Sequence, residues 1–380
     1  MKKIIIFTST GGGGHTAVSN ALKKYLDDTY TIEINDVFND VLGPLDLTNY
    51  LTGGRLTYVG IYNYYTAKKW YRFLNFMFKP AAWFFNTIAR TKIHTLLKNY
   101  FTQTKPDLII SVAPLVNSFI LDVAQQKNIP FLLVPTDLDL DTFIINIKKP
   151  TYKKFKIALP FDDAQEKNEL AQAKIPSSMY DITGFVVGPE FFEPKDKDAI
   201  KNQYKITKDK PVILVILGSL GSQALYEFAQ QLAQLSFPAH LILCLGKEAL
   251  SKEAVQSITF PKYITVSMIA FTDRVSDLMA IADLLITKSG SVSVNEAIYM
   301  NLPMILDATS SILTWEAYNH DFIKKHGFGT NITDFTQLTQ LVTYILMPPA
   351  TQLGLYKNNL VIFEKKHGGD EIKKLIKAII

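Results

Sequence analysis

The segment KIIIFTSTGGGGH, from Lys3 to His15, decides the fold of the first half of the chain. A β-branched apolar run is followed by four glycines and a helical pattern, which is the order strand, tight turn, helix. The same order returns in VILVILGSLG, from Val212 to Gly221. At such strand ends, backbone N–H groups and the positive helix terminus face an anion. The repeated unit predicts two domains of one kind that hold a ligand between them.

Outward from these segments, short β-branched runs alternate with amphipathic stretches along the chain. This spacing of strand–helix–strand units predicts parallel sheets covered by helices. We therefore expect an α/β protein with two facing, doubly wound, Rossmann-like domains. Glycines and prolines between Gly184 and Pro194 mark the boundary, which predicts domains 1–188 and 189–380, the last helix being a candidate to pack back on the first domain. The expected strands are Lys3–Thr8, Thr31–Ile34, Leu108–Val112, Phe131–Val134, Lys156–Leu159, Val212–Leu217, His240–Leu245, Ile264–Ser267, Leu284–Thr287 and Met304–Leu306.

The composition of the 380 residues is that of a globular protein, with 48% hydrophobic and 20% charged residues. The single cysteine, Cys244, cannot form an internal disulfide or a Cys-based metal site, which fits a reducing cytosol. The segment Met1–Phe7 lacks the length and cleavage site of a signal peptide, and no stretch has the ~18 uninterrupted apolar residues of a membrane span. We expect a cytoplasmic protein that is soluble or peripheral to a membrane. P-loop, zinc-protease and hydrolase-elbow motifs are absent, which disfavours those enzyme classes.

The segment from Leu47 to Phe101, called the basic aromatic segment below, differs chemically from the rest. It holds eight Lys or Arg and no Asp or Glu, a local charge of +8, whereas the remainder has 32 basic and 35 acidic residues, or −3. If residues 81–101 form one helix, then Trp83, Arg90 and His94 share a side opposite an apolar stripe. Lipid headgroups favour aromatic and cationic side chains, so we expect this side to bind an anionic membrane. The alternative is that Trp83 packs against the flanking segment Tyr58–Phe78 and the lysines are solvated.

The four-glycine turn carries the candidates for acceptor chemistry. A turn without side chains lets a ligand approach backbone amides closely, so Gly12, Gly13 and Gly14 are expected to contact a substrate. His15 stands at the mouth of the first helix, a position suited to a general base. The alternative is a helix-capping turn with an exposed histidine. A dinucleotide site with Asp36 on the ribose is disfavoured, because the third glycine of G-x-G-x-x-G is missing.

A second candidate site lies in the stretch TKSGSVSVNE, which ends at Glu296. Its turn follows a predicted strand and opens a helix, which Ser289 and Ser291 are expected to cap and whose amides can hold a phosphate. Glu296 suits a sugar diol, because two acceptor oxygens match two adjacent hydroxyls. Ordinary capping with an exposed glutamate is the alternative. Farther on, Glu316 and Asn319 are three residues apart and share a helix face.

Three acids, Asp137, Asp139 and Asp141, alternate after the predicted strand Phe131–Val134. An Asp-x-Asp pair suggests a divalent cation, but no His or further carboxylate stands at ligand spacing. We therefore expect no metal site here.

In this order, the motifs resemble those of the processive glycolipid glycosyltransferases, the group of monogalactosyldiacylglycerol synthase and diacylglycerol glucosyltransferase, and more distantly of the lipid II-forming GlcNAc transferases. The resemblance runs from Ile4 to about Gly329. It implies a GT-B fold, a UDP-sugar donor, a lipid acceptor, and transfer without a metal or other cofactor. It also implies that His15, with Asp137 assisting, deprotonates the acceptor hydroxyl. The residues that match the family's donor site are Gly218, Ser219, Phe271, Ser289, Gly290, Ser291, Glu296, Glu316 and Asn319.

The sequence departs from the family at two places. Trp315 stands where a glutamine usually precedes Glu316, and Asp139 and Asp141 fill positions where the family has an aromatic residue and a histidine after Asp137. We expect transfer of a hexose or N-acetylhexosamine from a UDP-sugar to a diacylglycerol-type lipid at the inner face of a membrane, with inversion and no nucleic-acid partner. The alternatives are a non-hydrolysing UDP-sugar epimerase, which has no use for the basic aromatic segment, and a non-catalytic nucleotide-sugar or lipid-binding protein.

Overall fold

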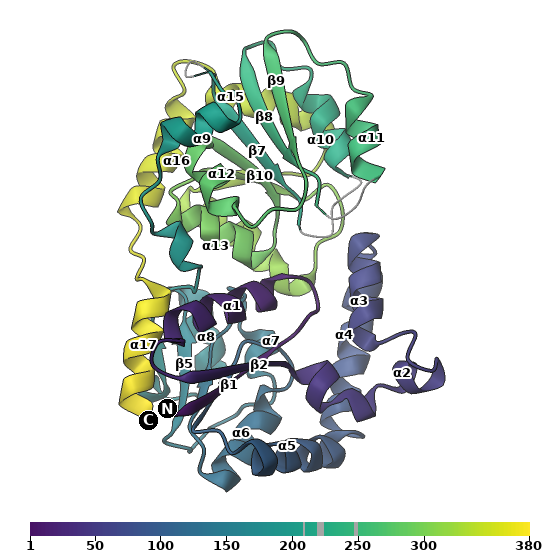
Figure 1. The fold of residues 1–380 in the computed structure, drawn as a ribbon, viewed down its shortest axis with the longest axis vertical. Coiled ribbons are helices and arrows are strands. Elements are labelled where there is room, and N and C mark those ends of the chain that lie inside the picture. Colours follow the sequence, from purple (N-terminus) through teal and green to yellow (C-terminus); the bar gives the residue numbers. More distant parts are fainter. Residues whose placement is uncertain (208–209, 219–223, 247–249) are drawn as a thin grey trace. The chain divides into compact units, whose positions relative to one another are not determined.

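The computed structural model describes residues 1–207, 210–218, 224–246 and 250–380, and its chain divides into two compact units (Figure 1). Unit 1 comprises Met1–Pro189, Leu313–Trp315 and Lys365–Ile380, and unit 2 comprises Glu190–Ile312 and Glu316–Glu364. Each unit holds a six-stranded parallel sheet with helices around it. The predicted α/β class with two doubly wound sheets is confirmed.

The sheet of unit 1 has the strand order β2-β1-β3-β4-β5-β6. Its central strands are apolar on both faces: Ile4, Ile5, Ile6 and Phe7 of β1 have no exposed surface, as parallel strands between two helical layers require. The five strands predicted here are confirmed, and the sixth, β6, is a short edge strand that the sequence did not reveal. The strands are β1 (Lys3–Thr8), β2 (Thr31–Asp36), β3 (Leu108–Ser111), β4 (Phe131–Leu133), β5 (Phe155–Leu159) and β6 (Tyr180–Ile182).

The helices of unit 1 include one from the end of the chain. Helix α17 packs against α1, and a Cβ on its Gly369 would fall 2.2 Å from the ring of Tyr25, so only glycine permits this approach. Tyr25 also donates to the carbonyl of Val187 at 3.2 Å. The helices are α1 (Gly14–Leu26), η1 (Val37–Val41), η2 (Gly43–Leu45), α2 (Leu47–Leu51), α3 (Tyr58–Ala67), α4 (Tyr71–Asn86), α5 (Arg90–Thr104), α6 (Asn117–Lys127), α7 (Asp141–Ile144), α8 (Ala164–Gln172), η3 (Ser177–Met179) and α17 (Gly368–Ile379), and η4 (Pro189–Phe191) begins at the last residue before unit 2.

Unit 2 repeats the design with the strand order β12-β11-β10-β7-β8-β9. The five strands predicted here are also confirmed, and the edge strand β12 is again additional. The strands are β7 (Val212–Ile216), β8 (Ala239–Cys244), β9 (Ile264–Ile269), β10 (Leu284–Lys288), β11 (Met304–Asp307) and β12 (Gly329–Ile332), and the helices are α9 (Lys197–Gln203), α10 (Ala224–Leu232), α11 (Leu250–Gln256), α12 (Val275–Ile281), α13 (Ser291–Tyr299), α14 (Ala317–His326), η6 (Phe335–Gln337), α15 (Leu338–Leu346) and α16 (Thr351–Ile362). The short helix η5 (Thr314–Glu316) has its first two residues in unit 1 and its last in unit 2.

The prediction of one helix over residues 81–101 is wrong, because α4 ends at Asn86 and α5 begins at Arg90. At the break, the side chains of Asn86 and Thr87 bond back to the carbonyls of Ala82 and Trp83 at 2.7 Å each. Side chains that take up i−4 carbonyls compete with the backbone and bend or end helices. Trp83 therefore belongs to a different helix from Arg90. Among the described residues, no helix is both long and apolar enough to cross a membrane.

Candidate active site

The glycine turn of unit 1 is held by the carboxylate of Asp36. Asp36, at the end of β2, accepts the backbone N–H of Thr10 at 2.9 Å and its hydroxyl at 2.5 Å. The other oxygen of Asp36 caps η1 through the N–H groups of Phe38 and Asn39. These bonds occupy the carboxylate that a dinucleotide ribose would need, which agrees with rejecting that reading. Gly12 adopts φ +80, a left-handed conformation that favours glycine.

His15 lies one residue into α1, whose N-cap is Gly13. Its Nδ1 is 2.7 Å from the hydroxyl of Thr136, directly before Asp137, so the structure brings the first helix and the segment after β4 together. Burial lowers the pKa of His15 to about 4, against smaller opposing effects of the Val112 backbone and of Asp36. The imidazole is therefore neutral at pH 7 and able to accept a proton. Asp137 is itself 9% exposed.

The acids after Asp137 form a cluster with a residue that the sequence did not single out. Oxygen atoms of Asp139, Asp141 and Glu169 come within 4.8 Å of one another. Asp139 already accepts the N–H of Asp141, and Glu169 accepts the N–H of Leu140, both at 2.9 Å. Burial raises the pKa of Glu169 to about 7. The cluster thus ties the segment after Asp137 to α8.

The second candidate turn, in unit 2, lies at the carboxyl ends of β7 and β10. Gly218 follows β7 with φ +100, and a Cβ there would fall 3.4 Å from the Cε of Lys288. A Cβ on Gly290 would fall 3.0 Å from the same carbon. The two glycines therefore leave room for the lysine chain, which brings a cation to the start of α13. Ser219 lies outside the described residues.

The expectation that Ser289 and Ser291 cap α13 is wrong. The N-cap residue is Gly290, and the hydroxyls of both serines have other partners. The hydroxyl of Ser289 donates to Glu316 at 3.3 Å, and Glu316 also pairs with Lys288 at 3.2 Å. The partner of Ser289 is Glu316, 27 positions along the chain, and the partner of Ser291 is Asn319, 28 positions along. Local sequence cannot show such contacts. The structure thus brings Ser289, Gly290 and Glu316 together around Lys288.

Asn319 is fully buried beneath the same turn. Its amide nitrogen donates to the carbonyl of Ser289 at 2.5 Å and to the hydroxyl of Ser291 at 2.9 Å. With no exposed surface, it acts on this site by holding the turn. Of Glu316 and Asn319, only Glu316 has an accessible side chain, with 12% of its surface exposed.

Glu296 is half-buried on α13, one and a half turns after Ser291. Burial raises its pKa to about 8, and the nearby Glu190 adds to the effect. Burial therefore keeps this carboxyl neutral at pH 7. Hydrogen-bond donors such as the hydroxyls of a diol would lower its pKa again by stabilising the charged form.

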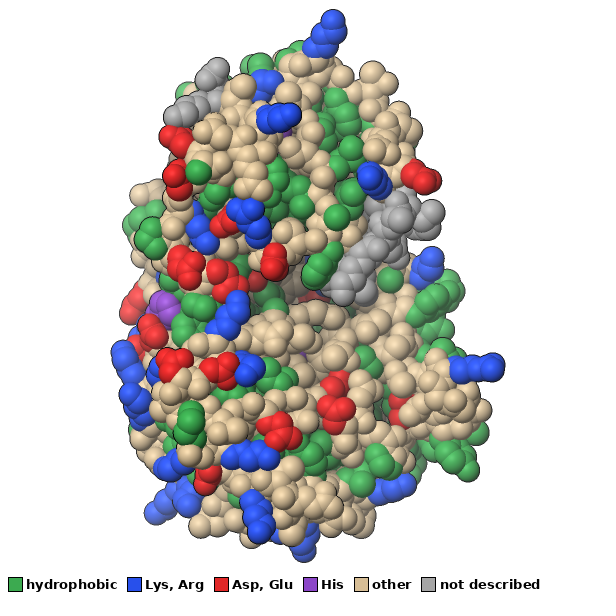
Figure 2. Space-filling model, in the orientation of Figure 1, with side chains coloured by type: hydrophobic (Ala, Val, Ile, Leu, Met, Phe, Trp, Pro, Cys, Tyr) green, Lys and Arg blue, Asp and Glu red, His purple; other side chains and the backbone are tan. Residues whose placement is uncertain are grey.

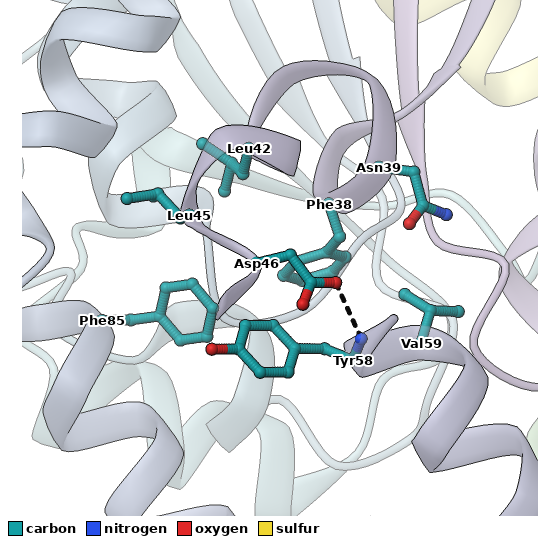
Figure 3. Close-up of a pocket in the computed structure, with 8 residues that line it drawn as sticks. All are labelled: Phe38, Asn39, Leu42, Leu45, Asp46, Tyr58, Val59 and Phe85. Carbon is teal, nitrogen blue, oxygen red and sulfur yellow. Dashed lines mark hydrogen bonds between the residues drawn. The ribbon is translucent and has the colours of Figure 1, made fainter. Parts of the chain in front are cut away.

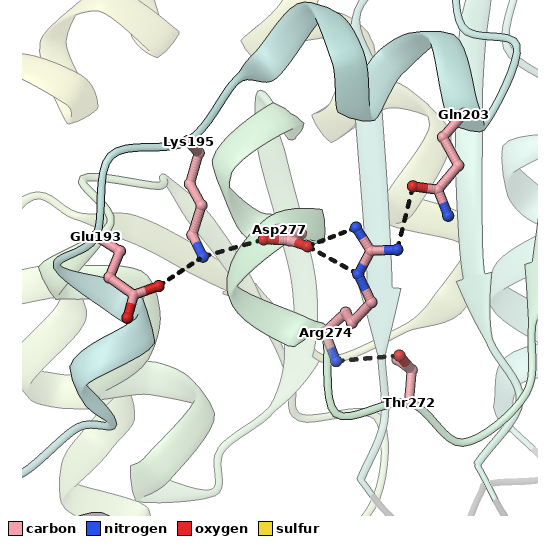
Figure 4. Close-up of polar contacts among 6 residues, drawn as sticks. All are labelled: Glu193, Lys195, Gln203, Thr272, Arg274 and Asp277. Carbon is pink, nitrogen blue, oxygen red and sulfur yellow. Dashed lines mark hydrogen bonds and ion pairs between the residues drawn. The ribbon is translucent and has the colours of Figure 1, made fainter.

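The turn that follows β9 presents Phe271, 58% exposed, and is fixed by an ion-pair network (Figure 4). Arg274 donates through Nε and a terminal nitrogen to Asp277 at 2.9 and 2.8 Å, and through its other terminal nitrogen to Gln203. Asp277 also pairs with Lys195 at 3.1 Å. Thr272 accepts the N–H of Arg274. The network holds the N-cap of α12, Arg274, three residues after Phe271.

The proposed membrane residues are only partly as expected. Trp83 is 60% exposed on α4. Arg90 pairs with Asp122 at 3.2 Å and lies over the ring of Phe119, and His94 is 3.5 Å from the same carboxylate. Arg90 and His94 are therefore partnered within unit 1, and they do not share a helix with Trp83.

Two residues with clear places at these turns were not singled out from the sequence. Lys288 had a usable signal, because a cation at the end of a central strand, before a serine–glycine turn, fits an anion site. Asn63 had none, since it contacts the glycine turn from 51 residues away. The departure at Trp315 also has a structural role: its ring stacks on Tyr62 and packs against Phe78 within unit 1.

Comparisons with known proteins agree with this arrangement. Residues 212–362 match the glycosyltransferase family 28 C-terminal domain. A processive diacylglycerol beta-glucosyltransferase of Staphylococcus saprophyticus is 27% identical over 349 residues, covering 86% of this chain and 80% of that protein. The enzyme of the same name from Bacillus subtilis is 23% identical over 371 residues, covering 94% and 90%.

Solved structures share the fold across the whole chain. Acinetobacter baumannii MurG superposes with a TM-score of 0.63 at 16% identity and covers all of both chains. A UDP-GlcNAc 2-epimerase from Neisseria meningitidis gives 0.58 at 14% identity, covering 99% of this chain and all of the other. The chain therefore has a GT-B fold whose residues 212–362 match the glycosyltransferase family 28 C-terminal domain, and the resemblance to the processive glycolipid glycosyltransferases is confirmed.

Proposed function

We propose that this chain transfers a hexose or N-acetylhexosamine from a UDP-sugar to the hydroxyl of a diacylglycerol-type lipid at a membrane surface. The observation that carries the proposal is the turn at β10 and α13, where Lys288, Gly290 and Glu316 meet at a helix N-terminus within the matched domain. A cation and the amide dipoles of a helix N-terminus at one place suit a diphosphate leaving group. The similarity to the epimerases is one of fold, whereas the similarity to the glucosyltransferases extends along the sequence.

The chemistry assigned to the residues is a single displacement. The acceptor oxygen attacks the anomeric carbon, its proton passes to the neutral imidazole of His15, and the bond from that carbon to UDP breaks with its electron pair leaving on the diphosphate. Lys288 and the α13 terminus stabilise the charge that develops there. Attack from the face opposite UDP inverts the anomeric centre and gives a β-glycoside from an α-linked donor.

Product analysis tests the reaction class directly. Labelled UDP-glucose, UDP-galactose and UDP-GlcNAc are incubated with the protein and vesicles that contain diacylglycerol. We expect label in a glycolipid with one of the three donors and no label transfer without vesicles. A new UDP-sugar would identify an epimerase instead, and binding of UDP without any product would identify a non-catalytic binder.

A membrane surface for this reaction is offered by α4. Arg72, Phe76, Lys79 and Trp83 recur at intervals of four, three and four residues and therefore share one face of the helix. All four are exposed, Phe76 by 72%. Figure 2 shows hydrophobic and basic side chains together over the part of unit 1 that holds α2 and α3. Alternating aromatic and cationic side chains suit an anionic headgroup layer.

Close to this surface lies a small apolar hollow (Figure 3). Its walls come from the segment that follows β2, from the start of α3 and from α4. Asp46 accepts the N–H of Tyr58 at 2.8 Å and so fixes one of its walls. The hollow has room for only about one water molecule, so it is a packing gap between these elements and not a site for a lipid chain. Its lining residues are Phe38, Asn39, Leu42, Leu45, Asp46, Tyr58, Val59 and Phe85.

We expect vesicle sedimentation to show binding that rises with the fraction of anionic lipid and falls with salt. Each Lys or Arg near an anionic bilayer contributes ~1 kcal/mol, so the double replacement of Arg72 and Lys79 by glutamine should weaken binding by roughly 10- to 30-fold. Replacing Trp83 by serine should weaken it further. The matched control is Tyr344→Ser, which removes a 65% exposed aromatic side chain from unit 2. If vesicle binding does not change with lipid charge, with salt or in the α4 variants, this face of α4 has no membrane role.

The donor role of Glu296 predicts that Glu296→Ala weakens both UDP and uridine binding by ~1.5 to 3 kcal/mol, the range for hydrogen bonds to a charged group, because the ribose hydroxyls would shift this carboxyl to its charged form on binding. Calorimetry measures both ligands, with Glu364→Ala, an exposed glutamate of the same unit, as the control. An unchanged affinity in a folded Glu296 variant would remove Glu296 from the ribose site.

A further inference from the structure

The glycine turn and the membrane-facing helices are joined by one side chain of α3. The amide oxygen of Asn63 accepts the N–H of Gly12 at 2.8 Å, and its amide nitrogen donates to the carbonyl of Thr10 at 3.1 Å. The oxygen and the nitrogen of the side-chain amide are thus both bonded to the backbone, one on each side of Gly11. They hold the turn three residues before His15.

The neighbouring residue completes the contact. A Cβ on Gly11 would fall 3.3 Å from the ring of Tyr62, so the ring lies against the bare backbone of the turn. No residue of α3 is fully buried, and its packing is against α4, where the ring of Tyr65 contacts Trp70 and Phe73. The attachment of α3 to the turn therefore rests on Asn63 and Tyr62 rather than on a core.

The outer side of α3 belongs to the basic aromatic segment. Tyr64 is 59% exposed, and the following residues Lys68 and Trp70 are exposed too. Helix α3 and the residues that follow it thus expose aromatic and cationic side chains, and α3 itself is bonded to the turn beside His15 through Asn63. Anything that fixes the position of α3 also fixes the turn.

We propose that Asn63 is a positioning residue that couples docking of α3 on a lipid surface to the conformation of the glycine turn. This inference rests on the proposed function, because the turn is taken to present the acceptor hydroxyl to His15. Free in solution, α3 and the turn move together. Docked on a bilayer, α3 is immobilised, and through Asn63 the turn adopts the arrangement that permits transfer. Misplacement by about 1 Å at such a group costs on the order of 10²-fold in rate.

Hydrogen–deuterium exchange of the peptide that spans residues 8–17 tests the coupling without relying on activity. We expect its exchange in the wild type to slow when anionic vesicles are added, and the slowing to be lost in Asn63→Ala. Asn63→Asp should behave like Asn63→Ala, because a carboxylate can accept from Gly12 but places a second acceptor against the carbonyl of Thr10. The matched control is Asn99→Ala, an exposed asparagine on α5.

Kinetics and binding complete the test. Asn63→Ala should lower kcat for transfer by ~10- to 100-fold, with vesicle binding and UDP affinity within twofold of the wild type. Tyr64→Ser should do the opposite, weakening vesicle binding while the turnover of bound enzyme is kept. If exchange at residues 8–17 is the same in Asn63→Ala and wild type, the coupling is refuted even where no transfer is observed; if wild-type exchange responds but no glycolipid forms, the proposed function fails and the coupling stands.

Discussion

Replacing His15 with alanine should slow glycosyl transfer by roughly 10² to 10⁴-fold, the contribution of a positioned general base. UDP binding should be unchanged, because the donor residues lie in unit 2 and His15 in unit 1. Single-turnover transfer and UDP calorimetry on the same preparation separate the two properties. Thr136→Val, which removes only the partner of Nδ1, should cost less than the loss of the imidazole itself.

The pH dependence carries a second signature of His15. Burial lowers its pKa from 6.5 to about 4, and the reaction needs the neutral ring. Protonation therefore removes activity only as the pH falls through about 4, so the rate at saturating donor should be flat from pH 5 to 7 with respect to this group. An acidic limb near 6.5 that disappears in His15→Ala would show that the ring is solvated in the working enzyme. Wild-type turnover in His15→Ala would leave His15 as a capping-turn residue.

The central strands could be predicted from sequence, because a strand buried on both faces must be apolar at every position. β1 and β7 are of this kind, and their predicted starts at Lys3 and Val212 agree with the structure. The edge strands β6 and β12 were missed, since Tyr180–Ile182 and Gly329–Ile332 are short and carry polar residues on partly exposed positions. The other two edge strands, β2 and β9, are six residues long and could be predicted, so it is the short length of β6 and β12 that makes them resemble loops.

The site divides in the same way. Residues that act through their own position in a strand–turn–helix unit, such as His15 and Glu296, could be singled out from local pattern. Partners that arrive from elsewhere could not: the hydroxyls of Ser289 and Ser291 look like helix caps until Glu316 and Asn319 are seen to take them. Asn63 is the extreme case, because an asparagine within a polar, aromatic helix carries no mark of the turn it holds.

Lys288 is the residue on which the leaving group should depend most. Its chain passes between Gly218 and Gly290, and its ammonium group pairs with Glu316 at 3.2 Å beside the start of α13. With a third of the side chain exposed, the cation is accessible to a diphosphate. The dipole of the α13 terminus and one full charge then converge on the oxygens that become negative as the sugar leaves, and removing a donor of this kind costs ~10² to 10³ in kcat.

Lys288→Met should therefore lower kcat by ~10² to 10³-fold and weaken UDP binding by ~10- to 100-fold, the effect of losing a charge-assisted hydrogen bond. Uridine, which lacks the phosphates, should bind the variant as well as it binds the wild type, in contrast to Glu296→Ala, which weakens both ligands. Lys324→Met, at an exposed lysine of α14, is the matched control. Glu316→Gln releases Lys288 from its ion pair, so UDP should bind that variant at least as tightly as the wild type while transfer still falls. Equal losses for uridine and UDP in Lys288→Met would show that the lysine supports the turn rather than the diphosphate.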